Sequence, residues 1–428
     1  MIHSLMHFHH RLSSPSAFLI AAIVFPFGLV SAEDVAEYSD SGKYVSDVDA
    51  KEVAGFSFPG PVGLKVDLFA GVSYFHDSNT SLTPVALSAD VVSYDFGFDI
   101  LKGNPGSQGV YYGVNYTGNA YSYGSGSSLG RDSLEQRVGA RLGVIGGKTR
   151  FRFNTDYYRN NGNSNDFDQL NRETRRSQSD DYNFDFTLAR DLAHSTLEFG
   201  AGFKERDFDS GTGVNDESGE YGDIAWFYQP GFAPKTDFGV GFRFGQDDYA
   251  LNPDQEYYTP SVRLRYAASA RTSFHSSLGY EFRDSNNPGS LDNEAVVYNG
   301  GLSWVPSAKT SIDFSFYKNN RPSYITGGED VDSTGVVLQM SNALPARFTL
   351  SNSIGYENAE YSPNTTGVVS LREDDFLRYR VSLGHPLRIT EEISGNVSVF
   401  YTYSNNDSTL GGAEFEQNVT GIRFGVMY

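Results

Sequence analysis

Apolar and mixed positions alternate along the segment Leu64-Lys65-Val66-Asp67-Leu68-Phe69-Ala70-Gly71-Val72-Ser73-Tyr74-Phe75. Its even-numbered residues are all apolar or aromatic, whereas Lys65, Asp67 and Ser73 stand at odd-numbered positions. Successive side chains of a β-strand point to opposite faces of a sheet. The segment therefore predicts a strand with one apolar face and one mixed, polar face.

The same alternation returns along the rest of the chain in about 18 segments, with no linker between them. These segments start near residues 63, 90, 109, 133, 149, 181, 195, 220, 236, 256, 272, 293, 310, 331, 347, 375, 392 and 414. Short connections such as 103–106 and 146–148 alternate with long ones such as 160–180 and 284–293. This rhythm is typical of a membrane barrel, whose short turns face the periplasm and whose long loops face the cell exterior.

The composition excludes several other classes of protein. After the first 30 residues, no apolar run approaches the roughly 18 residues that a membrane helix needs. A net charge of −20 argues against a general nucleic-acid binder, which needs a basic surface. A soluble β-sandwich also alternates, but the uninterrupted run over 63–428 is too long for one sandwich. Both tryptophans, Trp226 and Trp304, precede short turns, as an aromatic girdle at the periplasmic interface requires.

We therefore predict an all-β fold: a transmembrane, antiparallel, up-and-down β-barrel over 63–428, with short periplasmic turns and long extracellular loops. The expected strand number is about 18, with 16 as the alternative count. The expected location is the outer membrane of a Gram-negative bacterium, with outer-membrane lipid as a partner. The chain has no cysteine, so its stability has to come from backbone pairing and burial rather than from disulfides.

Residues 1–32 have the features of a secretory signal peptide. Arg11 precedes an apolar stretch over 17–30, and Val30-Ser31-Ala32 offers a cleavage site of small residues. The alternative, a membrane anchor, is disfavoured because the stretch is short and contains Pro26 and Gly28. Residues 33–62 are acidic and then rich in Gly and Pro, which predicts a flexible periplasmic N-terminal leader.

The end of the chain supports the barrel independently. Ile422, Phe424, Val426 and Tyr428 alternate with smaller or polar residues up to a terminal aromatic residue. This pattern resembles the C-terminal strand that the barrel-assembly machinery of the outer membrane recognises. The resemblance implies that these four residues are an assembly signal and that this machinery is a partner.

A narrower resemblance lies at the end of the first segment. The residues Phe75-His76-Asp77-Ser78-Asn79 resemble the aromatic-Asp-x-Asn element of a β-barrel porin family linked to exopolysaccharide loci in Gram-negative bacteria. His76 stands where that family has Tyr. The resemblance implies an outer-membrane pore that serves polysaccharide transport. From the residues alone, Asp77 and Asn79 are better explained as a turn that starts a loop than as a ligand site.

Charged side chains fall on the face opposite the apolar one, which would line the lumen of a barrel. The predicted pore-lining residues are Arg137, Arg141, Arg150, Arg152, Arg243, Arg263, Arg265, Arg378, Arg380, Asp95, Asp156 and Glu281. Separate walls rich in Arg and in Asp/Glu would create a transverse field that selects solutes by charge. The alternative is that these groups pair with one another and fill the lumen. The loop 160–180 is a candidate constriction, although a solvated surface loop fits it slightly better.

We expect a porin-like channel for hydrophilic solutes or an exported glycan. The alternative is a closed structural or binding barrel with acidic surface loops. The sequence contains no nucleophile elbow in the strand–turn–helix setting that it requires and no phosphate-binding glycine loop, so we expect neither an enzyme nor a cofactor. The acidic loop at 207–220 lacks the spacing of an EF-hand, and no metal site is predicted. Nothing in the sequence specifies an oligomer.

Overall fold

A computed structural model describes residues 58–60, 64–105, 107–124, 133–161, 177–209, 216–250, 252–285, 289–324, 329–367 and 372–428. The predicted signal peptide, the leader up to residue 57 and most of the candidate constriction loop at 160–180 lie outside these residues. The domain boundaries predicted for the N-terminal part therefore stay predictions.

The described chain is built almost entirely from β-strands. Their bounds are β1 (Phe58–Gly60), β2 (Leu64–Asp77), β3 (Ala89–Lys102), β4 (Gly109–Tyr123), β5 (Ser133–Gly146), β6 (Thr149–Asn160), β7 (Ser179–Asp191), β8 (Ser195–Phe208), β9 (Glu217–Tyr228), β10 (Thr236–Tyr249), β11 (Gln255–Ser269), β12 (Thr272–Asp284), β13 (Asn293–Ser307), β14 (Thr310–Pro322), β15 (Glu329–Ala343), β16 (Thr349–Pro363), β17 (Glu373–Arg388), β18 (Ser394–Ser408) and β19 (Phe415–Met427). A 3-10 helix at Pro345–Arg347 joins β15 to β16. Within the described residues, no helix is long and apolar enough to cross a membrane.

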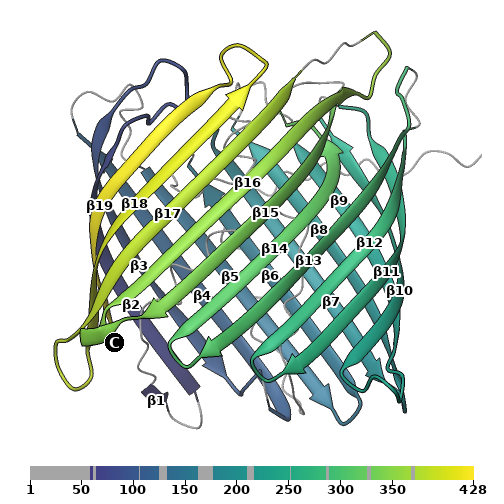
Figure 1. Ribbon diagram of the computed structural model, residues 1–428, viewed down its shortest axis with the longest axis horizontal. Coiled ribbons are helices and arrows are strands. Elements are labelled where there is room, and N and C mark those ends of the chain that lie inside the picture. Colours follow the sequence, from purple (N-terminus) through teal and green to yellow (C-terminus); the bar gives the residue numbers. More distant parts are fainter. Residues whose placement is uncertain are drawn as a thin grey trace, which may run out of the picture.

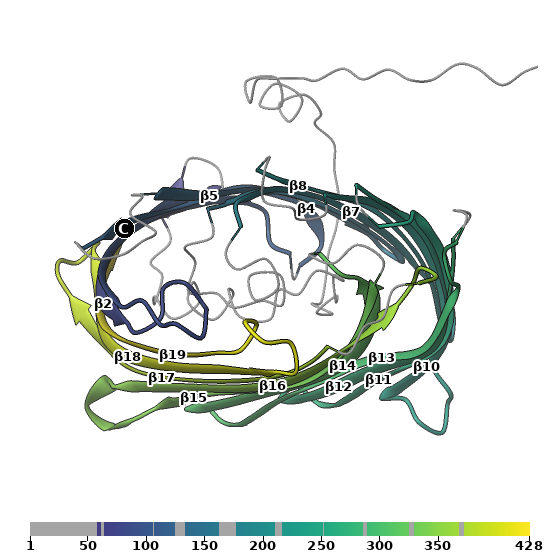
Figure 2. The ribbon, with the colours of Figure 1, turned by 90° about the horizontal axis from the view of Figure 1, so that it is seen from above.

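Strands β2 to β19 form one closed antiparallel barrel of 18 strands, which confirms the predicted fold (Figure 1). Each strand pairs with its sequence neighbours, and β19 pairs with β2 over Val419–Met427 and Phe69–Asp77, which closes the ring. The short strand β1 pairs with the part of β2 below the end of β19. Seen from above, the ring is elongated, with β2 near one narrow end and β10 near the other (Figure 2).

The strands begin where the alternation starts in the sequence. The largest difference is at β9, which was expected near residue 220 and begins at Glu217. Connections of a few residues, such as 147–148 and 270–271, lie at the end of the barrel that holds the C-terminus, and longer connections lie at the other end (Figure 1). By the usual orientation of membrane barrels, the first end faces the periplasm and the second faces the cell exterior.

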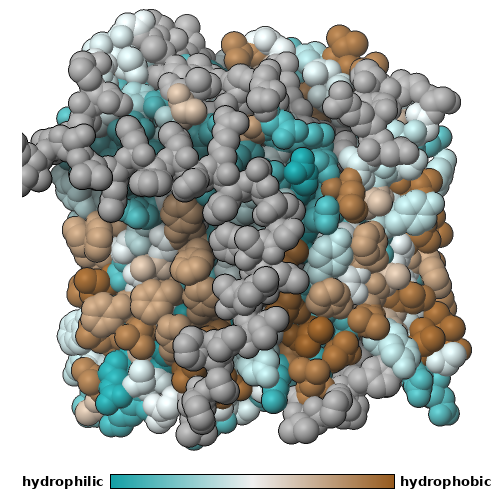
Figure 3. Space-filling model, turned by 180° about the vertical axis from the view of Figure 1, so that it is seen from behind, coloured by the Kyte–Doolittle hydropathy of each residue, from teal (hydrophilic) through white to brown (hydrophobic). Residues whose placement is uncertain are grey.

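The apolar side chains of the barrel point outward rather than into a central core. Val240, Val262 and Leu278, on three consecutive strands, are each more than half exposed. In Figure 3 such side chains form a band around the middle and lower part of the visible face, with hydrophilic side chains above it. A water-soluble protein rarely leaves so large an apolar surface uncovered.

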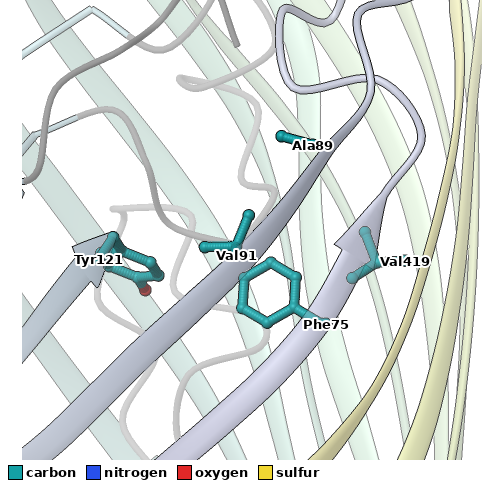
Figure 4. Close-up of a cluster of buried hydrophobic side chains, with 5 residues drawn as sticks. All are labelled: Phe75, Ala89, Val91, Tyr121 and Val419. Atoms are coloured by element: carbon teal, nitrogen blue, oxygen red, sulfur yellow. The ribbon is translucent and has the colours of Figure 1, made fainter. Parts of the chain in front are cut away.

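Where buried apolar side chains of the described residues pack together, they form small clusters. One cluster lies on the inner wall beside the β19–β2 closure and joins Phe75, Ala89, Val91, Tyr121 and Val419 (Figure 4). These residues come from β2, β3, β4 and β19. The cluster therefore packs the first strands of the barrel, β2 to β4, against the last strand, β19.

Candidate functional site: the wall of the lumen

The inner wall is lined by the residues that alternate with the exposed apolar ones. The predicted lining residues lie on β3 (Asp95), β5 (Arg137, Arg141), β6 (Arg150, Arg152, Asp156), β10 (Arg243), β11 (Arg263, Arg265), β12 (Glu281) and β17 (Arg378, Arg380). On β11, for example, Val262 is 57% exposed to the outside, whereas its neighbour Arg263 is half-buried on the inner side.

The arginines of β11 each hold a carboxylate with two hydrogen bonds. Arg263 donates from Nη1 to Asp223 Oδ1 at 2.9 Å and from Nη2 to Oδ2 at 2.5 Å. Arg265 donates from Nη1 and Nη2 to the two carboxylate oxygens of Glu198 at 2.8 and 2.7 Å. The guanidinium of Arg265 also lies 3.7 Å from the ring centre of Phe227. Bidentate pairs of this kind fix geometry as well as charge.

Similar pairs occur around the β2–β7 side of the barrel. They are Arg141–Asp99 (2.8 Å), Arg423–Asp95 (2.7 Å), Arg150–Asp191 (2.7 Å) and Arg137–Asp156 (3.9 Å). Basic and acidic side chains thus share one wall and neutralise each other locally, instead of forming separate Arg and Asp/Glu walls. The partners Asp191 and Asp223 were not among the predicted lining residues, although alternation with apolar neighbours places both on the inner face.

Several of these pairs reach across an intervening strand. Arg263–Asp223 crosses β10, Arg141–Asp99 crosses β4, and Arg423–Asp95 crosses β2. The pair Arg265–Glu198 crosses both β9 and β10, a separation of roughly 14 Å in a flat sheet. Such contacts require a concave wall, and three of these four pairs cross β2 or β10, at the narrow ends of the ring (Figure 2).

An inward glycine makes room for the bridge over β10. A Cβ added at Gly241 would stand 2.5 to 2.6 Å from Nε, Cζ and Nη2 of Arg263, which lies across the glycine on its way to Asp223. At Gly200, an inward glycine of β8, an added Cβ would meet its nearest atom at an ordinary 3.5 Å.

We therefore expect Gly241→Ala to push Arg263 away from Asp223 and to destabilise the barrel by about 1–3 kcal/mol. The matched variant Gly200→Ala should change stability by less than about 1 kcal/mol. Urea unfolding of both variants in lipid vesicles, followed by tryptophan fluorescence, measures the difference. Equal stabilities for the two variants would contradict this account of the bridge.

The facing wall, from β13 to β18, has a different chemistry. Hydroxyl and amide side chains predominate on its inner face. Examples are Asn299, Ser315, Gln339, Ser341, Ser351, Ser353, Ser398 and Thr402. In Figure 2 this wall lies across the ring from β4, β5, β7 and β8. The lumen is therefore lined by paired charges on one side, and on the other mainly by small neutral polar groups, among which stand Arg378, Arg380, Asp313 and Glu357.

At the extracellular mouth, the end of the β14–β15 hairpin lies inside the barrel. Tyr324, just after β14, contacts two residues of β8, which is six strands away. Arg206 donates from Nη1 to the Tyr324 hydroxyl at 2.8 Å, and the rings of Phe208 and Tyr324 are 6.3 Å apart. Burial, followed by the carboxylate of Glu217, raises the pKa of Tyr324 to about 12, so its hydroxyl stays neutral beside these charges.

On the β15 side of this hairpin, the carboxylate of Asp330 binds three other parts of the barrel. Asp330 is 1% exposed and accepts hydrogen bonds from Gln255 Nε2 (3.1 Å), Asn364 Nδ2 (2.7 Å) and Asn293 Nδ2 (2.8 Å). These donors belong to β11, β13 and the β16–β17 connection. Strict alternation along β15 would place Asp330 on the lipid side, so the hairpin has turned inward. Sequence periodicity alone does not reveal this turn.

The motif at the end of β2 forms a turn, as its residues predict. Asp77 Oδ1 accepts the backbone N–H of Asn79 at 2.9 Å, and both Asp77 oxygens accept from Gln417 Nε2 on β19. Asn79 Nδ2 donates to the carbonyl oxygens of Thr83 and Glu416. The motif thus fastens the loop after β2 to β19 at the closure of the barrel.

The remaining predicted residues make other contacts. The guanidinium of Arg243 lies 4.2 Å from the ring centre of Tyr221, and that of Arg380 lies 5.9 Å from that of Phe400. Glu281 accepts from Arg283 Nε at 2.7 Å. Among the described residues, no group of three or more His, Asp or Glu side chains could hold a metal ion. Ile422 and Phe424 on β19, and Tyr428 directly after it, are exposed, and Val426 is partly buried. The role of these four residues as an assembly signal stays a prediction.

The closed sheet and its apolar outer face define the class of protein. A closed antiparallel barrel pairs the backbone groups of every spanning strand, which is what a chain needs in hydrocarbon. Its outward apolar belt and charged inner wall are the arrangement of bacterial outer-membrane barrels. The protein is a transmembrane β-barrel of the Gram-negative outer membrane.

Three solved structures align with this chain over most of its length. The BenF-like porin of Pseudomonas fluorescens Pf-5 has a TM-score of 0.45 and 13% identity, over 85% of this chain and 98% of that chain. OccAB4 of Acinetobacter baumannii has a TM-score of 0.44 and 10% identity, over 85% and 98%. OpdK of Pseudomonas aeruginosa has a TM-score of 0.42 and 12% identity, over 85% and 99%. No protein-family model and no curated protein sequence matches the chain.

Proposed function

We propose that the protein is an outer-membrane channel for hydrophilic solutes and that its route runs between the two polar walls of the barrel. The observation that carries this proposal is the polar inner face of the 18-strand ring, with ion pairs on one side and hydroxyl and amide groups on the other. A barrel of this size can enclose an aqueous lumen. The predicted residues Arg137, Arg141 and Arg152 would line this route.

We propose further that the solute is a neutral hydroxyl-bearing molecule, such as a glycan, in keeping with the resemblance to porins linked to exopolysaccharide loci. Pairing cancels most of the charge along the wall, which leaves little net field to concentrate ions. The Ser, Thr, Asn and Gln side chains of the facing wall can donate hydrogen bonds to sugar hydroxyls and accept hydrogen bonds from them.

Conductance in planar lipid bilayers tests the channel. Current steps that fall when a neutral oligosaccharide is added would support the proposal, whereas a folded barrel without any current would contradict it. The second candidate, a closed structural or binding barrel, is favoured by one observation: the β14–β15 hairpin and the buried Asp330 occupy part of the extracellular mouth. A silent bilayer would support that candidate.

The ion pair Arg141–Asp99 gives a specific prediction for a conducting barrel. Arg141→Gln leaves the Asp99 carboxylate uncompensated in the lumen, so the cation-to-anion permeability ratio should rise about two- to threefold. The double variant Arg141→Gln/Asp99→Asn should return the ratio to that of the original protein, because both charges are removed. Reversal potentials in a salt gradient measure the ratio, and an unchanged ratio in the single variant would place the pair outside the route.

A further inference from the structure

The charges of the barrel are segregated along its axis. Exposed carboxylates gather at the extracellular ends of the strands: Asp90, Glu220, Asp248, Glu256, Asp284, Glu294, Glu360, Glu373, Asp407 and Glu416. Lys or Arg side chains stand in or beside all eight periplasmic turns: Lys102, Lys148, Arg190, Lys235, Arg271, Lys309, Arg347 and Arg388. In a chain of net charge −20, these eight side chains form a basic ring at this end, and among the described residues only at the β17–β18 turn do exposed carboxylates, Glu391 and Glu392, stand beside a member of the ring.

The members of this basic ring are available for contact outside the protein. All of them except the partly exposed Lys102 are exposed. Where hydrogen bonds of their side chains are seen, they go to neutral groups: Lys235 Nζ donates to the carbonyl oxygen of Ala268, and Arg388 Nε to that of Thr390. The ring follows the circumference, with the β17–β18 turn as its weakest point, and continues directly from the apolar belt above it, which fits a partner that surrounds the barrel better than one that docks on one side.

We propose that the basic ring binds the phosphate headgroups of anionic phospholipids in the periplasmic leaflet. A phospholipid places its acyl chains against the apolar belt and its headgroup at the level of the turns, which matches the order of apolar and basic residues along each strand. Lys and Arg near a membrane surface attract anionic headgroups and are screened by salt. The acidic extracellular end would repel the same lipids, so the ring also favours one orientation in the membrane.

The fluorescence of the two tryptophans can be used to measure this interaction. Trp226 and Trp304 are both 44% exposed on the outer surface close to the basic ring. The backbone N–H of Val305, next to Trp304, bonds to the carbonyl oxygen of Arg271 at 2.8 Å. Trp226 is near the turn that holds Lys235. No other tryptophan is present in the chain, so fluorescence reports only this girdle.

The experiment compares quenching of tryptophan fluorescence in vesicles that contain brominated phosphatidylglycerol or brominated phosphatidylcholine at equal fractions. We expect stronger quenching by the anionic lipid than by phosphatidylcholine. The ratio of the two quenching efficiencies should fall by about threefold or more in the triple variant Lys235→Gln/Arg271→Gln/Lys309→Gln, and it should also fall at high salt. The matched variant Lys235→Arg/Arg271→Lys/Lys309→Arg keeps the charges and should keep the preference.

Equal quenching by both lipids in the unmodified protein would overturn the proposal, as would a preference that survives in the triple Gln variant. Heat-dependent gel mobility shows whether each variant is folded. The readout does not depend on conductance, so it can succeed or fail separately from the proposed channel.

Discussion

Phe314→Arg should destabilise the barrel by about 2–4 kcal/mol, the cost of a cation at the centre of a lipid-facing belt. Phe314 is 36% exposed on the outer face and lies in the middle of the apolar positions Ile312, Phe314 and Phe316 of β14. Lys318, two positions beyond Phe316, marks the upper limit of this belt. Urea unfolding in lipid vesicles measures the change in free energy of unfolding.

The neighbouring residue supplies the matched control. Ser315 points to the lumen and faces Gly301 and Val337 on the adjoining strands. Ser315→Arg introduces the same side chain on the same strand, but it enters the lumen instead of hydrocarbon, so it should cost less than about 1 kcal/mol. Similar losses at the two positions would mean that hydrocarbon does not cover the apolar face.

Asp330→Ala should open the extracellular mouth and lower stability by about 2–4 kcal/mol, because three amide donors lose their shared acceptor in a buried site. Release of the β14–β15 hairpin should raise single-channel conductance and expose the hairpin to protease. Asp330→Asn keeps the shape of the side chain, but its NH2 group would face the amide donors and could not accept hydrogen bonds from them. We therefore expect an intermediate loss of stability.

A control lies two residues along the same strand. Asp332 pairs with Lys318 at 2.7 Å, and both side chains are partly exposed. Asp332→Asn should therefore cost less than about 1 kcal/mol and leave conductance unchanged. If Asp330→Ala behaved like Asp332→Asn, the three amide contacts would not be what holds the hairpin.

The strands and their faces were predictable from the sequence because both depend on a local rule. In the segment 64–75, each residue's face follows from its neighbours, and the structure places Val72 and Tyr74 outside and Ser73 inside accordingly. The turn at Asp77 and Asn79 was predictable for the same reason, since its first hydrogen bond joins residues two apart.

The contacts of the lumen could not be predicted in the same way. Arg265 reaches Glu198 only because the wall curves between β8 and β11, and curvature is a property of the closed ring rather than of any segment. The inward turn at Asp330 depends on donors from three distant parts of the chain. The alternating pattern predicts which residues face inward, but it does not predict which residues they contact there.

The meeting of β19 and β2 has a consequence for how the molecule is made. It joins side chains as far apart in the chain as Asp77 and Gln417, which are separated by 340 positions. Every other pairing in the barrel joins strands that are neighbours in the sequence, whereas this one spans the largest sequence separation and contributes most to the contact order. Until it forms, the curved sheet presents two open edges that can template pairing with other chains. Closing the ring is therefore the step that removes the last two open edges from the sheet.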